Sequence, residues 1–181
     1  MSKAAKVLRA FGLVVEAVVK ATEEKHGFRA VSCIKPKHLK KVKRIVEKVA
    51  MRPERDQCVA TVCDCVRMMV PVNKMRHVGW LLRAFCEPEV LAAAVLAAAA
   101  GASGATRLRL VRAKERFYRS PSAGGWRDLM LNLEIEANGV VVVGEVQIPH
   151  DTMLNARSGL PGHLIYNRVR NGSELVEFSM G

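Results

Sequence analysis

The stretch LMLNLEIEANGVVVVGEVQI, residues 129–148, decides the fold of this chain. Its first eight residues largely alternate apolar and polar side chains, as a strand with one buried face does. The ANG at residues 137–139 is a turn sequence, and residues 140–148 continue as a mainly apolar strand. The stretch therefore predicts a β-hairpin. In its second strand Glu145 and Gln147 are two residues apart, so they share one face of the sheet.

A tryptophan stands just before this hairpin, in GGWRD at residues 124–128. We expect Trp126 to be an exposed aromatic at the mouth of the first strand, facing the end of the second. A carboxylate at Glu145 would then hold a metal ion or a substrate hydroxyl beneath a stacked base. The alternative is structural, because a Trp before a strand is more often packed in the core and a lone strand Glu is usually solvated.

Composition limits the class of protein. The chain has 181 residues, half of them hydrophobic, which suits one domain over residues 1–181 with a single core. Its net charge is +12, and residues 1–55 contain 15 Lys and Arg against five acidic residues. Such an asymmetry attracts polyanions, whether nucleoside triphosphates, RNA or anionic lipid, and does not choose among them.

Cysteine usage and hydropathy predict a cytoplasmic protein. The five cysteines lack the paired spacing of zinc sites, and an odd number of thiols suits a reducing cytosol. The apolar residues 90–100 are too few to cross a bilayer, and Glu16 and Lys20 interrupt the first apolar stretch, unlike a secretory signal. We expect no membrane association. The oligomeric state stays open.

Periodicity predicts the remaining elements. Helices are expected over residues 3–24, over about 39–49 with a basic face, over 73–100 with a break at Pro88, over 151–157 and over 163–178. Short strands are expected over residues 28–34, 58–70 and 107–112. These elements predict an α+β fold with a mixed, mainly antiparallel sheet of about five strands flanked by helices.

Asp64 interrupts the expected strand at residues 58–70. A buried carboxylate needs a partner. One interpretation is a structural ion pair with Arg67 or another cation. The other is a divalent metal ion shared with Glu145.

Several motifs occur in an order that resembles the RelA/SpoT-like nucleotidyltransferase domain. They are RAKERF (112–117), SPSAGGWR (120–127), EVQI (145–148) and GHLIY (162–166), preceded by SCIKPK (32–37) and VCDCVR (62–67). In that family a basic strand runs into a loop with Pro and Gly, then a Tyr after Gly, an E-x-Q strand and a helix with a His. The chain departs from the family pattern at Arg67, which comes three rather than five residues after the Asp, at Arg127-Asp128, and at Met130 in place of His.

The resemblance implies an enzyme that transfers the β,γ-pyrophosphate of ATP to the ribose 3′-hydroxyl of GDP or GTP. It implies Mg²⁺ as cofactor, held by Asp64 and Glu145, with Glu145 also the base for the acceptor hydroxyl. For nucleotide binding it implies Lys35, Lys37, Arg112, Lys114, Trp126, Gln147 and His163, with Trp126 in the place of the Tyr that stacks on guanine.

Two other functions remain open. One is an RNA- or nucleotide-binding domain that keeps the fold without catalysis and uses its basic N-terminal third on phosphates. The other is a related enzyme that modifies an RNA end with the same carboxylates. Proximity of Asp64 to Glu145 favours either enzyme, and wide separation favours the binding domain.

Overall fold

The structure is a computed structural model that describes residues 3–34, 39–50, 62–101, 104–119, 121, 125–159, 172 and 176. Its helices are α1 (Lys3–His26), α2 (Val42–Ala50), α3 (Met75–Cys86), α4 (Pro88–Ala99) and α5 (Asp151–Gly159). Its strands are β1 (Arg67–Met69), β2 (Ala105–Glu115), β3 (Leu129–Ala137) and β4 (Val140–Ile148). None of the described helices is long and apolar enough to span a membrane.

The strands form one mixed sheet in the order β1-β4-β3-β2. β1 runs parallel to β4, and the other two pairings are antiparallel. The α+β fold and the mainly antiparallel sheet are therefore confirmed. The described part of the chain has four strands rather than about five, because the expected strand at residues 28–34 contributes only a single bridge, from Ile34 to Met69.

The predicted hairpin is β3 and β4. Asn138 and Gly139 form its turn with φ angles of 51° and 70°. Two consecutive positive φ angles are typical of the tight hairpin turn that Asn-Gly favours. This turn fixes the register, so that Ala137 pairs with Val140 and, farther along, Asn132 pairs with Glu145.

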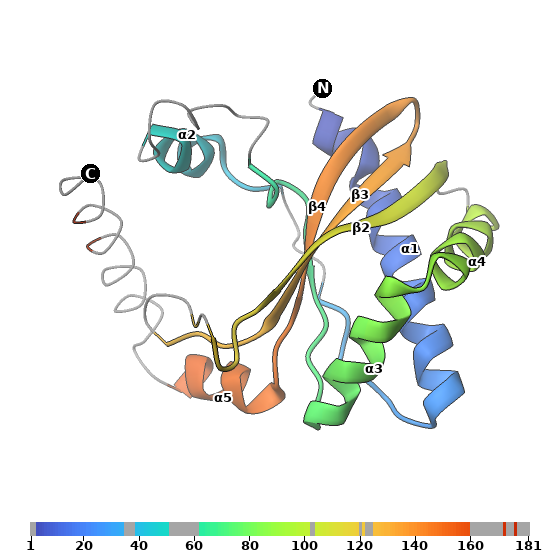
Figure 1. Ribbon diagram of the computed structural model, residues 1–181. Coiled ribbons are helices and arrows are strands. Elements are labelled where there is room, and N and C mark those ends of the chain that lie inside the picture. The colour runs from blue at the N-terminus through green and yellow to red at the C-terminus, as the bar shows by residue number, and fades with distance from the viewer. Residues whose placement is uncertain are drawn as a thin grey trace.

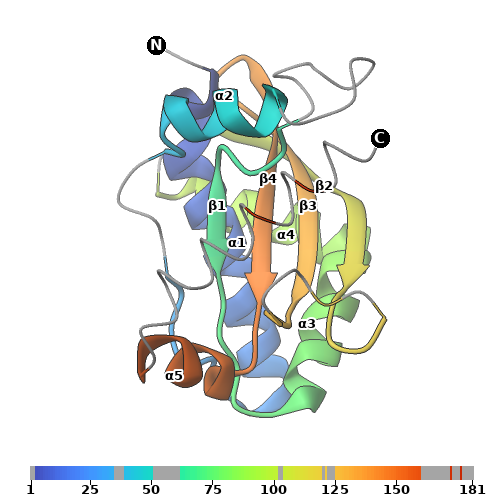
Figure 2. The same cartoon turned by 90° about the vertical axis from the view of Figure 1, so that its left-hand side faces the viewer.

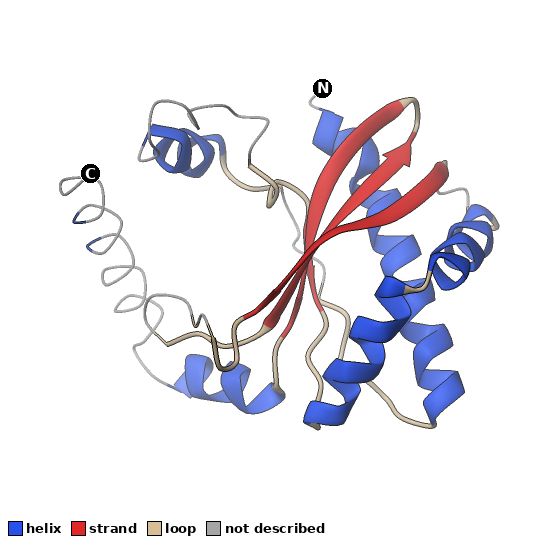
Figure 3. Cartoon of the chain, in the orientation of Figure 1, coloured by secondary structure: helices blue, strands red, loops and turns tan. Residues whose placement is uncertain are grey.

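Helices α1, α3 and α4 lie on one side of the sheet, whereas α2 and α5 lie towards the other (Figures 1 and 3). The apolar stripe of α1 forms the centre of the core, with Val7, Phe11, Val14, Val15 and Val18 fully buried. The view along the other side shows β1 and β4 running side by side between α2 and α5 (Figure 2). Helices α1, α3 and α4 thus pack on the face that carries the apolar side chains of β3, such as Leu131 and Leu133, and the alternate side chains of β3 point to the opposite face.

Two sequence expectations change. Residues 62–66 form turns and bends, so the described strand begins only at Arg67, and residues 58–61 lie outside the described residues. The reason is local bonding: the Cys65 thiol donates to the Val62 carbonyl oxygen, and the same segment contacts Lys40. The expected last helix at residues 163–178 lies almost entirely outside the described residues.

Candidate functional site

Four cations of β2 lie on the polar face of the sheet. Opposite them on β3 are Glu136, Glu134, Asn132 and Met130, which face Arg107, Arg109, Arg112 and Lys114 respectively. A register shift between Leu110 and Arg112 leaves Val111 outside this alternation. Because residues that face each other across strands share a face, this bulge brings odd-numbered and even-numbered cations to the same side.

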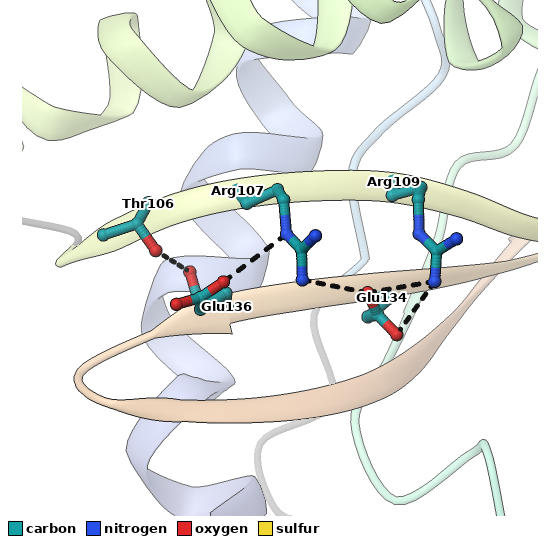
Figure 4. A network of polar contacts seen from close by, with 5 residues as sticks. All are labelled: Thr106, Arg107, Arg109, Glu134 and Glu136. Carbon is teal, nitrogen blue, oxygen red and sulfur yellow. Dashed lines mark hydrogen bonds and ion pairs between the residues drawn. The ribbon is translucent and has the colours of Figure 1, made fainter.

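Near the start of β2, which lies beside the β3–β4 turn, carboxylates neutralise the cations (Figure 4). Arg109 Nη2 lies 3.2 Å from both oxygens of Glu134. Arg107 bridges Glu134 and Glu136, with 3.4 Å separations from Nη2 and Nε. These four side chains form a charge-balanced ladder.

At the other end of β2 the facing residues are neutral. Arg112 Nε donates a 2.8 Å hydrogen bond to Asn132 Oδ1, and Lys114 faces Met130. Both cations are exposed. The positive charge of β2 is therefore concentrated at Arg112 and Lys114, as a site for phosphate groups requires.

Glu145 lies in the same cross-sheet row. Arg67 on β1, Glu145 on β4, Asn132 on β3 and Arg112 on β2 face one another in register. Two strand spacings, or about 10 Å, separate β2 from β4, a span that an arginine and a bound phosphate can bridge. The row thus combines a cation, a carboxylate, an amide and a second cation.

Gln147 positions the Glu145 carboxylate. Its Nε2 donates a 2.8 Å hydrogen bond to Glu145 Oε1, and Glu145 is only 9% exposed. The expectation that these residues share a face is confirmed. The Gln147 amide holds one oxygen of the Glu145 carboxylate, so the orientation of this carboxylate is set within the protein itself.

Asp64 lies in the turn before β1 and pairs with Lys40. Lys40 Nζ is 2.5 Å from Asp64 Oδ2, and both side chains are largely buried. The expectation that Asp64 lies within a strand is wrong, since it lies in a turn and Arg67 is the β1 residue that faces Glu145. The structural interpretation, an ion pair with a cation, describes this carboxylate, although the cation is Lys40 and not Arg67.

The two acidic residues nevertheless belong to neighbouring chain segments. The backbone N–H of Glu145 donates a 2.9 Å hydrogen bond to the carbonyl oxygen of Val66, two residues after Asp64. Carboxylate oxygens suit Mg²⁺, which commonly uses one or two of them together with substrate phosphates. Within the described residues no group of three or more His, Cys, Asp or Glu side chains gathers as a metal site. The donor chemistry fits magnesium, and a shared ion at Asp64 and Glu145 stays a prediction.

The expectation of an exposed Trp126 is wrong. Its side chain is 8% exposed, and its indole Nε1 donates a 2.9 Å hydrogen bond to Asp128 Oδ2. Asp128 is fully buried and accepts two hydrogen bonds from Arg116, at 2.6 and 2.7 Å. Asp128 supplies a partner for the indole N–H and so draws the ring inward.

Among the described residues at this end of the sheet, Tyr118 is an exposed aromatic, at 81% exposure. The Glu115 carboxylate orders its loop by accepting hydrogen bonds from the backbone N–H groups of residues 117–119. These bonds, foremost the one from Arg119, lower the pKa of Glu115 below its ordinary value. The Arg127 guanidinium also donates to the Phe117 carbonyl oxygen. Tyr118 is therefore an exposed ring held on an ordered loop next to β2.

The structure brings together Arg112, Lys114, Glu145 and Gln147 on one face. Lys35, Lys37 and His163 lie outside the described residues, so their place at the site stays a prediction. Sequence reasoning missed Asn132 and Lys40. The signal for Asn132 was present, because the Asn-Gly turn fixes the hairpin register and with it the pairing of residue 132 with residue 145.

No protein-family model matches this sequence, and no curated protein is significantly similar to it. Solved structures are similar in fold. The small alarmone synthetase 1 from Bacillus subtilis bound to its product pppGpp has a TM-score of 0.60 and 14% identity, over 96% of this chain and 87% of that one. The small alarmone synthetase 2 from Bacillus subtilis has a TM-score of 0.51 and 16% identity, over 92% of this chain and 90% of that one. The chain therefore has the fold of the small alarmone synthetases, the α+β fold expected from the RelA/SpoT resemblance.

Proposed function

We propose that the chain transfers pyrophosphate from ATP to the ribose 3′-hydroxyl of GDP or GTP. The observation that carries the proposal is the set of polar side chains that β2 and β4 place on one face of the sheet. A buried, amide-fixed carboxylate, Glu145, and two cations without facing carboxylates, Arg112 and Lys114, share one face of the sheet. The fold that the chain shares with a synthetase whose structure holds pppGpp supports this reading.

The reaction makes three demands. A bond forms between the ribose 3′-oxygen and the β-phosphorus of ATP, the bond from that phosphorus to the α,β-bridging oxygen breaks, and AMP leaves. The acceptor hydroxyl must be aligned and lose its proton, and the charge on the phosphoryl oxygens must be stabilised.

Different residues would meet these three demands. Glu145, whose carboxylate is oriented by the hydrogen bond from Gln147, aligns the acceptor hydroxyl and takes its proton. Arg112 and Lys114 bind phosphate oxygens as fixed positive charges. Lys35, Lys37 and His163 are proposed as further phosphate contacts. Tyr118 offers an exposed ring on which a base can stack.

Magnesium would be held by Asp64 and Glu145 and would stabilise charge on the phosphate chain. In the structure Asp64 pairs with Lys40, so metal binding at Asp64 has to compete with this ion pair. We therefore expect activity to depend on Mg²⁺ concentration, and Lys40→Met to lower the Mg²⁺ concentration that gives half-maximal activity.

One observation favours a second function, that of a nucleotide- or RNA-binding domain without catalysis. Trp126 is buried and does not offer the stacking face that the resemblance implied. The basic residues of the N-terminal third would then bind RNA phosphates.

One experiment separates these functions. The protein is incubated with Mg²⁺ and ATP labelled at the γ-phosphate, together with GDP, GTP, other nucleoside diphosphates and triphosphates, or a short RNA, and the products are separated by chromatography. Label in guanosine tetra- or pentaphosphate supports the proposal. Label on RNA indicates an enzyme that modifies RNA ends. Absence of transfer to any acceptor, together with salt-sensitive RNA binding, supports the binding domain.

A further inference from the structure

We propose that Asn132 recognises the 2′-hydroxyl of the acceptor, so that the site selects ribonucleotides over 2′-deoxyribonucleotides. The inference rests on the proposed function, because it places the ribose of the acceptor against Glu145. It adds a residue and a specificity that the RelA/SpoT resemblance did not imply.

The orientation of the Asn132 amide is fixed by Arg112. A guanidinium has only donors, so the atom that accepts the 2.8 Å hydrogen bond from Arg112 Nε must be the amide oxygen. The amide nitrogen then points to a different partner. Asn132 is 1% exposed, so this arrangement is held in a buried part of β3.

The amide nitrogen, Nδ2, has no hydrogen-bond partner within the described structure. A buried donor without a partner is unusual, since buried polar groups are nearly always paired. Such a donor destabilises the protein when no ligand is bound, and it gains a hydrogen bond when a ligand places an acceptor atom beside it. It therefore indicates a place for a ligand oxygen.

Glu145 identifies the kind of oxygen. Asn132 faces Glu145 directly in the antiparallel pairing, where facing Cβ atoms lie about 4.5–5.5 Å apart. An amide donor beside a carboxylate acceptor complements neighbouring hydroxyl groups, because a hydroxyl both donates and accepts. A ribose presents such a pair: Glu145 takes the proton of the 3′-hydroxyl, and Asn132 Nδ2 donates to the 2′-oxygen.

Selectivity follows from the unpaired donor. A 2′-deoxyribonucleotide leaves Asn132 Nδ2 buried and still unpaired, and a site built to bond a hydroxyl discriminates against the analogue that lacks it. The deoxy acceptor retains its 3′-hydroxyl, so the chemistry itself stays possible. The expected difference is therefore in kcat/KM for the acceptor.

The test compares GTP with 2′-deoxyGTP as acceptors at saturating ATP. We expect the wild type to prefer GTP by about 10- to 100-fold in kcat/KM, the range for one buried hydrogen bond. Asn132→Asp keeps the acceptor oxygen for Arg112 and replaces the Nδ2 donor with an oxygen, so the preference should fall below about twofold, as one such bond is lost. Asn132→Leu should do the same. Glu136→Gln, on the same face of β3 at the hairpin end, should keep the preference.

Equilibrium binding of GDP and 2′-deoxyGDP without ATP separates this inference from the proposed function. If the wild type transfers no pyrophosphate but binds GDP more tightly than 2′-deoxyGDP, and Asn132→Asp abolishes that difference, the proposed function fails and the role of Asn132 stands. An equal affinity of the wild type for both nucleotides overturns the inference. So does a folded Asn132→Asp protein that keeps the wild-type preference, with folding checked by circular dichroism and thermal unfolding.

Discussion

The ring of Phe11 on α1 fills the space that a side chain at Gly144 of β4 would occupy. A Cβ built at Gly144 would lie 2.6 Å from Phe11 Cε2 and 2.7 Å from Cζ. The glycine lets α1 pack closely on the sheet directly beside Glu145, whose side chain points to the opposite face. The close approach of helix and strand thus fixes the backbone from which the candidate base projects.

Gly144→Ala should therefore lower the free energy of unfolding by about 1–3 kcal/mol through overpacking. Urea unfolding followed by circular dichroism measures this change. Gly79→Ala is the matched control, because Gly79 lies in α3 with nothing within 4 Å of its Cβ position. That substitution should stabilise the protein by about 0.5–1 kcal/mol, as Ala is the better helix residue. Equal effects at the two positions would contradict this packing.

Asp128→Ala should lower the free energy of unfolding by about 3–5 kcal/mol, the range for breaking a buried ion pair. The substitution removes the acceptor of both Arg116 and the Trp126 indole. Chemical denaturation measures the change. The control is Glu136→Gln, whose ion pair with Arg107 is largely exposed and should matter by less than about 1 kcal/mol. If Asp128→Ala lowers the free energy of unfolding no more than Glu136→Gln does, the hydrogen bonds that Asp128 accepts contribute little to stability.

Arg112→Gln should weaken ATP binding by about 1.5–3 kcal/mol, the range for a hydrogen bond to a charged group. Arg109→Gln should change it little, because Glu134 already neutralises Arg109. The two residues lie on the same strand and the same face, so the comparison isolates the effect of pairing with a carboxylate in the charge-balanced ladder. Isothermal titration calorimetry at two salt concentrations measures both variants. A similar loss for both would assign the effect to overall charge.

Glu145→Gln should reduce kcat by about a hundredfold or more, the loss expected when a general base is removed. Folding and nucleotide binding should persist, since Gln is of similar size. Steady-state kinetics and nucleotide titration on the same preparation measure both properties. Glu136→Gln again serves as the control. Unchanged turnover in an active enzyme would rule out Glu145 as the base.

Acidification should destabilise the protein through His77. Burial, aided by Arg76 and Lys74, lowers the pKa of His77 below its ordinary value of 6.5. The unfolded chain therefore binds the proton more readily, so the stability contributed by neutral His77 is present above pH 6.5 and is lost as pH falls towards the lowered pKa. Comparing urea unfolding at pH 7.5 and 5.5 tests this, with His77→Phe as the variant that keeps the stacking on Phe28 but cannot titrate. Identical pH dependence in the two proteins would exclude His77 as the cause.

The pattern of apolar and polar residues along the sequence correctly predicted the helices and strands whose periodicity is strong. The β3–β4 hairpin, its Asn-Gly turn, α1, and the break between α3 and α4 at Pro88 all form near the expected residues. The placing of Glu145 and Gln147 on one face followed for the same reason, because alternation along a strand is a property of the backbone.

What the sequence by itself determined is therefore the hairpin, its turn and the placing of Glu145 and Gln147 on one face, since all of these depend on residues close along the chain. Only the tertiary structure decided that Asp64 pairs with Lys40, 24 residues away, and that Trp126 turns inward to the Asp128–Arg116 pair. The structure also decided, through the bulge beside Leu110, which cations of β2 are neutralised and which remain for phosphate. Such outcomes depend on which side chains meet when separate strands, turns and helices pack, and the periodicity of a single element does not encode that meeting.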